Sequence, residues 1–191
     1  MGKFSEGARL QGRWGEGENK SVKLREIRGK KILFPQLLTI IKMITIRKAK
    51  PEDASTIIDF QQKMAWETEQ MTLVPEIVSK GVNGVFEDSS RGQYYVAESN
   101  GLIVASLLIT YEWSDWRNSN VWWFQSVYVL AEYRRTGVFR KMYSFIKDEA
   151  DKNKIAGLRL YVESNNMRAC KTYEALGMSS EHYKMYEWLR E

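Results

Sequence analysis

The hydrophobic pattern of this chain changes period several times, and each change marks the boundary of a predicted element. Alternating or continuous apolar runs rich in β-branched and aromatic residues are typical of strands. Apolar residues that recur every three to four positions are typical of helices. On this basis we predict strands over residues 44–49, 92–99, 102–113, 121–130, 158–162 and 182–189. Helices are predicted over 51–70, 75–86 and 138–151, and from Asn165 or Ser164, as the capping residue, to Gly177.

Local signals support these boundaries. Pro51 suits the first turn of a helix, and Glu52 beside it suits the positive end of the helix dipole. Asn100-Gly101 between two apolar runs predicts a hairpin. The predicted order is β-α-α-β-β-β-α-β-α-β, without an internal repeat. This order indicates an α/β fold with a mixed, mostly antiparallel sheet and helices on both faces.

Charge is distributed unevenly along the chain. Residues 1–42 hold ten Lys+Arg and four Asp+Glu, a net +6, whereas the whole chain carries +5. The remainder is therefore close to neutral, so a nucleic-acid partner would have to bind the basic segment alone. We interpret residues 1–42 as a basic, flexible extension and residues 43–191 as the folded domain, for which Met43 could itself serve as an initiator.

Membrane insertion and secretion are not expected from this segment. The apolar run over residues 32–44 is interrupted by Pro35 and Lys42 and is too short to span a bilayer. Basic residues precede it, as in a signal peptide, but no A-x-A-like cleavage site follows. A tail that touches nucleic acid or anionic lipid stays the alternative to a mobile extension.

The scarcity of cysteine and histidine limits the chemistry. Cys170 is the single cysteine, which excludes an intrachain disulfide and a multi-cysteine zinc site. His182 is the single histidine, which disfavours a histidine-rich metal site and a Ser-His-Asp triad. We therefore expect no metal site, and we interpret both residues as packing or surface residues. Carboxylates, tyrosines, backbone amides or a bound cosubstrate must supply any reactivity.

One segment predicts an anion site. The apolar strand that ends at Leu130 is followed by Arg134-Arg135-Thr136-Gly137-Val138-Phe139, which opens a helix. A glycine-bearing turn into a helix directs several backbone N–H groups to one point, where the helix dipole adds positive charge. Basic side chains on both sides of the glycine add further donors. The pattern favours phosphate or pyrophosphate binding.

Two motifs together resemble the GCN5-related N-acetyltransferase (GNAT) family. The loop 134–139 is similar to the family's acetyl-CoA loop, Gln/Arg-x-x-Gly-x-Gly/Ala, with Phe139 at the last small position. Residues 166–178 are similar to its Asn-x-x-Ala-x-x-x-Tyr-Glu-x-x-Gly-Phe signature, with Met178 in place of Phe. The resemblance runs from about Ile44 to Trp188 and implies the acyl-CoA N-acyltransferase fold.

The resemblance implies acetyl-CoA as the cosubstrate. In such proteins the strand before the loop splays from the next strand, pantetheine pairs with backbone groups in the gap, and the loop holds the pyrophosphate. Carried over position by position, this assigns cofactor binding to Val127, Tyr128, Val129, Arg134, Arg135, Thr136, Gly137, Val138, Phe139, Arg140, Asn166, Ala169 and Tyr173. We expect a cytoplasmic enzyme with a small-molecule amine as partner and no membrane association; a homodimer stays open.

Acetyl transfer to an amine requires an acid for the leaving thiolate, a polariser for the carbonyl and a base for the amine. The resemblance assigns the acid to Tyr173, since a phenol with pKa near ~10 suits this role. The backbone N–H near Val129 is the expected polariser. The base is less defined, because strand 121–127 lacks a carboxylate. We predict Glu112, with Asp115, Glu67, Glu69 and a water relay as alternatives.

The acceptor site is expected among aromatic residues. Trp66, Tyr111, Trp113, Trp116, Trp122 and Trp123 occur close to these acids in the sequence. Alternation places half of them in the core, and the others suit a cation-accepting pocket for a small amine. Two further functions stay open: a peptide or protein N-acetyltransferase, and a non-catalytic acyl-CoA-binding or regulatory module.

Overall fold

The computed structural model describes residues 25–27, 30–32, 43–163, 165–181, 184–188 and 190. The chain divides into two parts, residues 1–40 and 41–191, and each is considered by itself. In the first part, β1 (Arg25–Ile27) pairs antiparallel with β2 (Lys30–Ile32). The flexible extension predicted for residues 1–42 otherwise lies outside the described residues.

The second part is built on a five-stranded sheet in the order β3-β4-β5-β6-β7. Its strands are β3 (Ile44–Lys48), β4 (Gln93–Ser99), β5 (Leu102–Ser114), β6 (Ser119–Val129) and β7 (Gly157–Arg159). Neighbours pair antiparallel except β6 and β7, which are parallel. The predicted mixed, mostly antiparallel sheet is confirmed.

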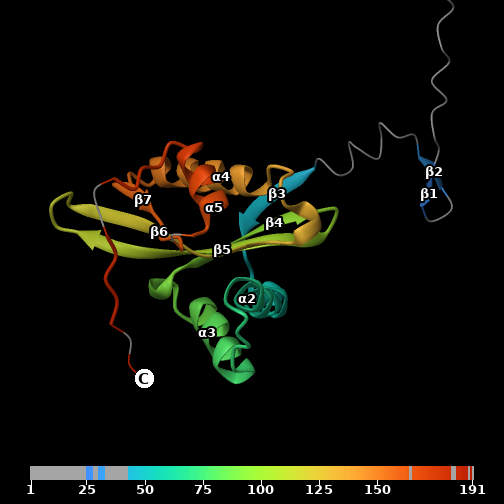
Figure 1. The fold of residues 1–191 in the computed structure, drawn as a ribbon, viewed down its shortest axis with the longest axis horizontal. Coiled ribbons are helices and arrows are strands. Elements are labelled where there is room, and N and C mark those ends of the chain that lie inside the picture. The colour runs from blue at the N-terminus through green and yellow to red at the C-terminus, as the bar shows by residue number, and fades with distance from the viewer. Residues whose placement is uncertain are drawn as a thin grey trace, which may run out of the picture. The chain divides into compact units, whose positions relative to one another are not determined.

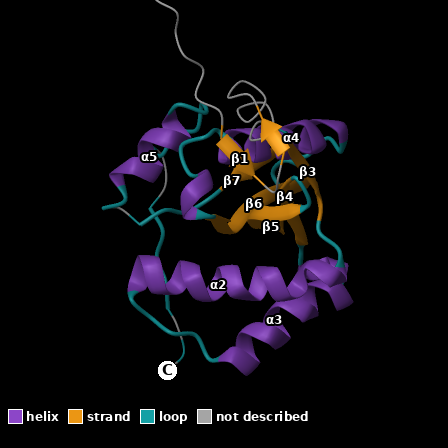
Figure 2. Cartoon of the chain, turned by 90° about the vertical axis from the view of Figure 1, so that its right-hand side faces the viewer, coloured by secondary structure: helices purple, strands orange, loops and turns teal. Residues whose placement is uncertain are grey.

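Helices cover both faces of this sheet (Figure 1). The helices α2 (Ala54–Glu69) and α3 (Pro75–Glu87) lie on one face, as Figure 2 also shows. The helices α4 (Val138–Lys152) and α5 (Met167–Glu174) lie on the other. Short 3-10 turns precede α2 (Pro51–Asp53), β4 (Ser89–Arg91) and the loop that leads into α4 (Ala131–Tyr133).

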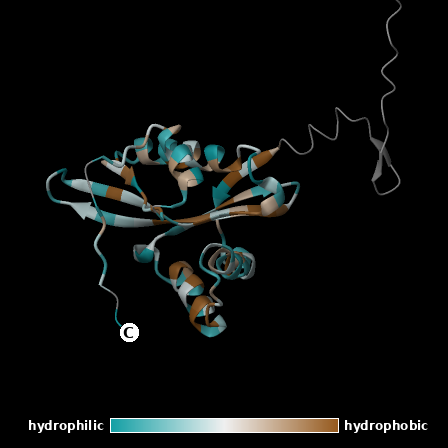
Figure 3. Ribbon diagram, viewed as in Figure 1, coloured by the Kyte–Doolittle hydropathy of each residue, from teal (hydrophilic) through white to brown (hydrophobic). Residues whose placement is uncertain are grey.

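Alternation along β4 explains why both faces are covered. Tyr94 and Val96 pack with α2 and α3, whereas Tyr95 and Ala97 belong to the cluster that includes α4. Successive side chains of a strand point to opposite faces, so an apolar run buries both. Figure 3 shows the hydrophobic residues concentrated along the central strands and on α3. The two apolar layers pack the sheet between the helix pairs.

A β-bulge interrupts β6. Ser106 of β5 pairs with Tyr128, but Leu108 pairs with Gln125, so β6 contains one extra residue in this interval. Ser126 takes up the irregularity with a positive φ of 49°. On its other side, backbone pairing of β6 with β7 covers only Val121–Trp123 among the described residues. A bulge bends its strand and increases twist, so β6 leaves β7 and a gap opens between them.

The C-terminal part departs from three predictions. The strand predicted over 182–189 is wrong for residues 184–188, which adopt no regular structure; His182, Tyr183 and Leu189 lie outside the described residues. β7 ends at Arg159 instead of residue 162, because the splayed β6 offers no further backbone partner. The cap of α5 is Asn166, whose side chain accepts a hydrogen bond from the N–H of Ala169 at 3.1 Å.

Candidate active site

The loop between β6 and α4 has the geometry of an anion cradle. Arg135 and Gly137 both adopt left-handed backbone conformations, with φ of 66° and 87°. Between them, the Thr136 hydroxyl donates to the carbonyl of Tyr133 at 2.7 Å and tightens the turn. The first helical hydrogen bond runs from the Lys141 N–H to the Gly137 carbonyl. The N–H groups of the first turn of α4 therefore have no carbonyl partner within the helix.

A cavity of about 540 Å³ lies between this loop, β6, α2 and α5. Its lining includes every residue predicted to bind the cosubstrate except Thr136. The structure thus brings together positions separated by almost fifty residues in the sequence, from Val127 to Tyr173. Residues of β6, α2, α4 and α5 contribute, together with the loop before α4, and the gap beside the β6 bulge forms part of the cavity.

The backbone direction of β6 supports the use of this gap. The Leu130 N–H donates to the Val104 carbonyl of β5 at 2.9 Å. Because consecutive peptide groups in a strand point to opposite sides, the N–H of Val129 points away from β5 and toward the gap. The Val129 carbonyl, on that same side, accepts a hydrogen bond from Arg134 Nε at 2.8 Å.

Arg134 is held in place by the protein itself. Besides its bond to Val129, it forms an ion pair with Glu67 of α2, and its guanidinium lies 5.3 Å from the centroid of the Tyr128 ring. These three contacts fix the side chain, so Arg134 joins α2 to β6. The resemblance assigned Arg134 to the cosubstrate; the structure places it in the lining but already engaged with these partners.

Glu67 completes a polar network at the lining of the cavity, with its side chain 37% exposed. Its carboxylate also accepts a hydrogen bond from the Tyr128 hydroxyl at 2.8 Å. Burial raises the pKa of Glu67, but the hydrogen bonds from Arg134 and Tyr128 outweigh it and leave this pKa below its ordinary value. Burial and the bond to Glu67 raise the pKa of Tyr128 to about 12. Glu67 is therefore ionised and Tyr128 neutral at physiological pH.

Tyr173 lines the same cavity from α5. Its ring lies edge-on against Phe139 of α4, with centroids 5.7 Å apart and planes at 73°. Burial, with a smaller contribution from Cys170, raises the pKa of Tyr173 above its ordinary value. The phenol therefore keeps its proton through neutral and mildly alkaline pH, which a proton donor requires.

Phe139, the departure from the acetyl-CoA loop pattern, has a packing role. Its ring also lies 6.5 Å from the rings of Phe124 and Tyr143, which stack on each other. Aromatic pairs at such distances favour edge-on and offset geometries. The large side chain therefore points into the core between α4 and α5, while its backbone stays in the cradle.

The four acids considered as base occupy different environments. Glu112 forms an ion pair with Arg159 at 2.7 Å and accepts a hydrogen bond from Trp123 Nε1, and it does not line the cavity. Asp115 and Glu69 are exposed. Glu67 alone among the four lies in the lining. The structure does not bring Glu112 together with Tyr173, and its role as base stays a prediction.

The aromatic residues also separate into two groups. Trp122 is buried in the core, and Trp123 packs against Arg159 and Tyr161. The others are exposed on the surface: Trp66, Tyr111, Trp113 and Trp116, at 56%, 40%, 62% and 88%. Alternation along β6 accounts for the difference between Trp122 and its neighbour. None of the six lines the cavity.

Five residues that line the cavity were not predicted from the sequence to be part of the site: Met64, Thr68, Tyr133, Arg168 and Thr172. Met64 and Thr68 stand four positions apart on α2, with Glu67 on the same face, so helical spacing could have grouped them. Arg168 and Thr172 occupy variable positions of the second motif, again four apart. Helical periodicity applied to the variable positions would have found both.

The structure also bears on metals and membranes. Within the described ranges, no group of three or more His, Cys, Asp or Glu side chains is placed to hold a metal ion. Among these same residues, no helix has the length and apolar character needed to cross a bilayer.

Both the family model and a solved structure that match this chain are described as acetyltransferases. The sequence model of the acetyltransferase (GNAT) family matches residues 54–178. The crystal structure of "a possible acetyltransferase" from Clostridium difficile 630 is 44% identical to the chain, with a TM-score of 0.72. That similarity covers 78% of this chain and 99% of the other. No curated protein matches the chain.

More distant structures share the fold. A predicted acetyltransferase with acetyl-CoA from Clostridium acetobutylicum is 16% identical, with a TM-score of 0.62 over 76% of this chain and 96% of its own. Ribosomal-protein-alanine N-acetyltransferase from Brucella melitensis biovar Abortus 2308 is 13% identical, with a TM-score of 0.65 over 78% and 100%. Because the family model spans most of the folded part and includes both motifs of the cavity, the chain belongs to the GNAT family of acetyltransferases.

Proposed function

We propose that this protein transfers an acetyl group from acetyl-CoA to a primary amine of a small molecule, with Tyr173 as the general acid. One observation carries the proposal. A single cavity of about 540 Å³ gathers the anion cradle, the splayed edge of β6 and Tyr173. These are the parts that a thioester bearing a pyrophosphate requires: an anion site, a backbone edge and a proton donor.

The residues present fit acetyl-CoA. The N–H groups of Val138, Phe139 and Arg140, in the first turn of α4, would hold the pyrophosphate where the helix dipole favours negative charge. The backbone edge of Val127 would pair with an amide of pantetheine as a neighbouring strand would, since the Val129 carbonyl already accepts a hydrogen bond from Arg134. Asn166 and Ala169 contribute the α5 side of the cavity and place Tyr173 one turn further along the helix.

Acetyl-CoA supplies a thioester whose C–S bond breaks as a C–N bond forms with the acceptor nitrogen. The Val129 N–H, directed toward the gap, stabilises the negative charge that develops on the carbonyl oxygen. The Tyr173 hydroxyl gives its proton to the departing sulfur and later regains one from solvent. General-acid catalysis of this kind contributes about 10²–10⁴ in rate.

The acceptor must lose a proton as well. An alkylammonium with pKa near ~10.4 lies about three units above neutral pH. Glu112 is engaged with Arg159 and Trp123, and Glu67 is held by Arg134 and Tyr128. These pairings support a water relay that carries the proton from the amine to solvent, in preference to direct abstraction by either carboxylate.

The acceptor class is inferred from the surface near α2 and β5. Trp66 and Trp113 are exposed outside the cavity lining, where their aromatic faces attract a cationic amine. One solved structure with a similar fold is named ribosomal-protein-alanine N-acetyltransferase. The experiment below therefore includes peptide acceptors as well as small amines.

Release of coenzyme A, measured with a panel of small amines and peptides, tests the proposal. We expect turnover with small primary amines, and a Tyr173→Phe variant should lose about 10²–10⁴-fold in kcat. Affinity for acetyl-CoA should change little, because the substitution removes only the hydroxyl. Tight acetyl-CoA binding without product from any acceptor would instead favour a non-catalytic binding module. Wild-type turnover by Tyr173→Phe would refute the role of the tyrosine.

A further inference from the structure

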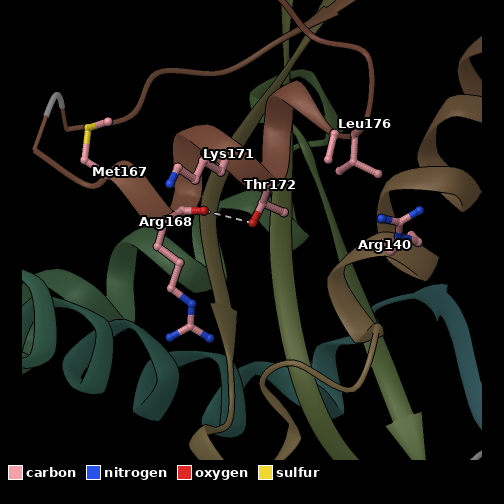
Figure 4. A pocket seen from close by; sticks show the side chains of 7 residues that line it. Arg140, Met167, Arg168, Lys171, Thr172 and Leu176 are labelled. Carbon is pink, nitrogen blue, oxygen red and sulfur yellow. Dashed lines mark hydrogen bonds between the residues drawn. The ribbon is translucent and has the colours of Figure 1, made fainter.

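The cavity of about 540 Å³ takes its positive and negative charges from different elements. Basic side chains come from the loop before α4, from α4 and from α5: Arg134, Arg135, Arg140 and Arg168. Figure 4 shows Arg140 and Arg168, together with Lys171, around an adjoining cavity. Among the described residues of the lining, Glu67 of α2 is the single carboxylate. The cavity therefore offers one negative side chain, and it comes from the α2 side.

Glu67 lies close to the peptide group that is proposed to stabilise the carbonyl oxygen. The Arg134 side chain connects the two, because its Nε donates to the Val129 carbonyl at 2.8 Å and its Nη2 donates to Glu67 Oε2 at 2.5 Å. A single guanidinium therefore separates the carboxylate from the backbone of Val129. The attacking nitrogen has to approach this same region, since it must reach the thioester carbon whose oxygen faces the Val129 N–H.

The Glu67 carboxylate can accept a further hydrogen bond. An ionised carboxylate has about four acceptor sites on its two oxygens. Arg134 donates to one oxygen and the Tyr128 hydroxyl to the other, so sites remain on both. The side chain is partly exposed, and a ligand in the cavity can therefore reach these sites. The two existing bonds hold the carboxylate in a fixed position.

Resting on the proposed function, we infer that Glu67 determines the acceptor class by binding the ammonium group of a cationic alkylamine beside the Val129 peptide. A primary ammonium has three N–H donors and is attracted to an ionised carboxylate. The arginines of the lining repel the same group, so Glu67 is its one anionic partner among the described lining residues. Glu67 holds the cation, and the proton passes to water. An alcohol of the same size lacks this attraction.

Isothermal titration of the full chain saturated with coenzyme A tests the inference, because coenzyme A carries no acetyl group and only binding is measured. The probes are butylamine, benzylamine and phenethylamine, each compared with the alcohol of the same carbon skeleton. We expect the wild-type protein to bind at least one amine about 5–10-fold more tightly than its alcohol, since Arg134 and solvent offset part of the attraction. Glu67→Gln should remove this preference and leave the affinity for the alcohol within about twofold of wild type.

Two further variants separate the charge of Glu67 from its structural contacts. Glu67→Asp keeps the charge and should keep part of the preference for the amine. Glu76→Gln removes an exposed carboxylate of α3 outside the cavity and should keep all of it. Equal weakening of amine and alcohol binding by Glu67→Gln would leave Glu67 a structural role alone and overturn the inference.

Steady-state rates with acetyl-CoA distinguish a cation-binding residue from a base. Glu67→Gln should raise the KM for the preferred amine by about 5–10-fold and leave kcat within about threefold of wild type. A large loss of kcat with an unchanged KM would make Glu67 the base and overturn the inference. A wild-type protein that acetylates amines but binds amine and alcohol equally would also overturn it, with the proposed function standing. A wild-type protein that does not bind coenzyme A would overturn the proposed function itself.

Discussion

Gly137 determines the shape of the anion cradle through its backbone alone. It adopts a φ of 87° at the N-terminal boundary of α4, and a Cβ built there would meet no atom within 4 Å. The constraint is therefore conformational and not a matter of space. A residue other than glycine pays a conformational free-energy cost of about 1–2 kcal/mol in the left-handed region.

A Gly137→Ala substitution should lower the free energy of unfolding by about 1–2 kcal/mol. If the loop relaxes instead, the N–H groups of the first turn of α4 lose their common direction, and affinity for acetyl-CoA should fall by about 5–30-fold. Chemical denaturation and titration with acetyl-CoA measure the two effects. If Gly137→Ala changes neither the stability nor the affinity for acetyl-CoA, the assigned role of the glycine is contradicted.

The matched control is Gly81→Ala on α3. This position also has open space around a new Cβ, but it lies inside a helix with ordinary φ. Alanine there should raise stability by about 0.5–1 kcal/mol, because it reduces the freedom of the unfolded chain. The same chemical change should thus have opposite signs at the two sites.

At the residue scale, motif spacing predicted the position of Tyr173 well but not the engagement of Arg134. The lining includes Tyr173 because α5 begins at the predicted motif. Arg134 is held by Glu67, sixty-seven positions earlier in the chain. A long-range ion pair of this kind depends on how α2 packs against β6, which no local pattern records.

At the element scale, the strands with two buried faces were predictable from the sequence. The bulge in β6 and the length of the edge strand β7 were not. Apolar runs defined β4, β5 and β6 to within a few residues. The bulge at Ser126 left no sequence signal, because serine is not a residue that favours positive φ. The short β7 lies at the edge of the sheet, and residues 184–188 adopt no regular structure, since apolar alternation alone does not establish strand pairing.

One ion pair joins two elements at the start of the sheet. Arg47 of β3 donates to both carboxylate oxygens of Asp53, at 2.7 and 3.1 Å, and the Lys50 N–H donates to the same carboxylate at 2.8 Å. The Asp53 side chain is only 10% exposed. The bond from Arg47 lowers the pKa of Asp53 further than burial raises it.

This pKa shift predicts how stability depends on pH. The folded pKa of Asp53 lies below the ordinary value of 3.8, so its contribution is fully present above that pH and is lost as pH falls through the folded pKa. Asp53→Asn should cost about 1.5–3 kcal/mol at pH 7. Urea denaturation should show the difference from wild type shrinking at acid pH.

A pH-independent difference would contradict the assignment of Asp53 as a carboxylate stabilised by Arg47. Asp59→Asn serves as the control. Asp59 pairs with Lys63 one turn away, and both side chains are about half exposed. An exposed pair of this type contributes about 0.3–0.5 kcal/mol, so this variant should stay close to wild type at every pH.

At the scale of the whole molecule, both apolar clusters formed by described residues lie within Ile44 to Met178. One contains the sheet face under α4, and the other the face under α2 and α3. The family match over residues 54–178 falls in the same interval. The fold class was predictable because helix and strand periodicities differ, and these clusters hold the elements together.

A chain that begins at Met43 should therefore keep its unfolding temperature within about 2 °C, since a change of 1 kcal/mol shifts this temperature by roughly 2–8 °C. Its acetyl-transfer rate should also be unchanged. Calorimetry and coenzyme A release compare the two chains. Salt-dependent binding to DNA or anionic vesicles by the full chain alone would establish a role for the basic segment; equal binding would remove that hypothesis.

The bulge in β6 has a consequence for how such proteins diversify. It turns the N–H of Val129 toward the cavity, and every residue except proline provides the same peptide groups. Substitution of Val129 by another residue with a backbone N–H therefore keeps this donor, provided that the bulge persists. Exposed residues such as Trp66 and Trp113 can change independently, because neither lines the cavity. The same scaffold can thus acquire new acceptors while retaining one acetyl donor.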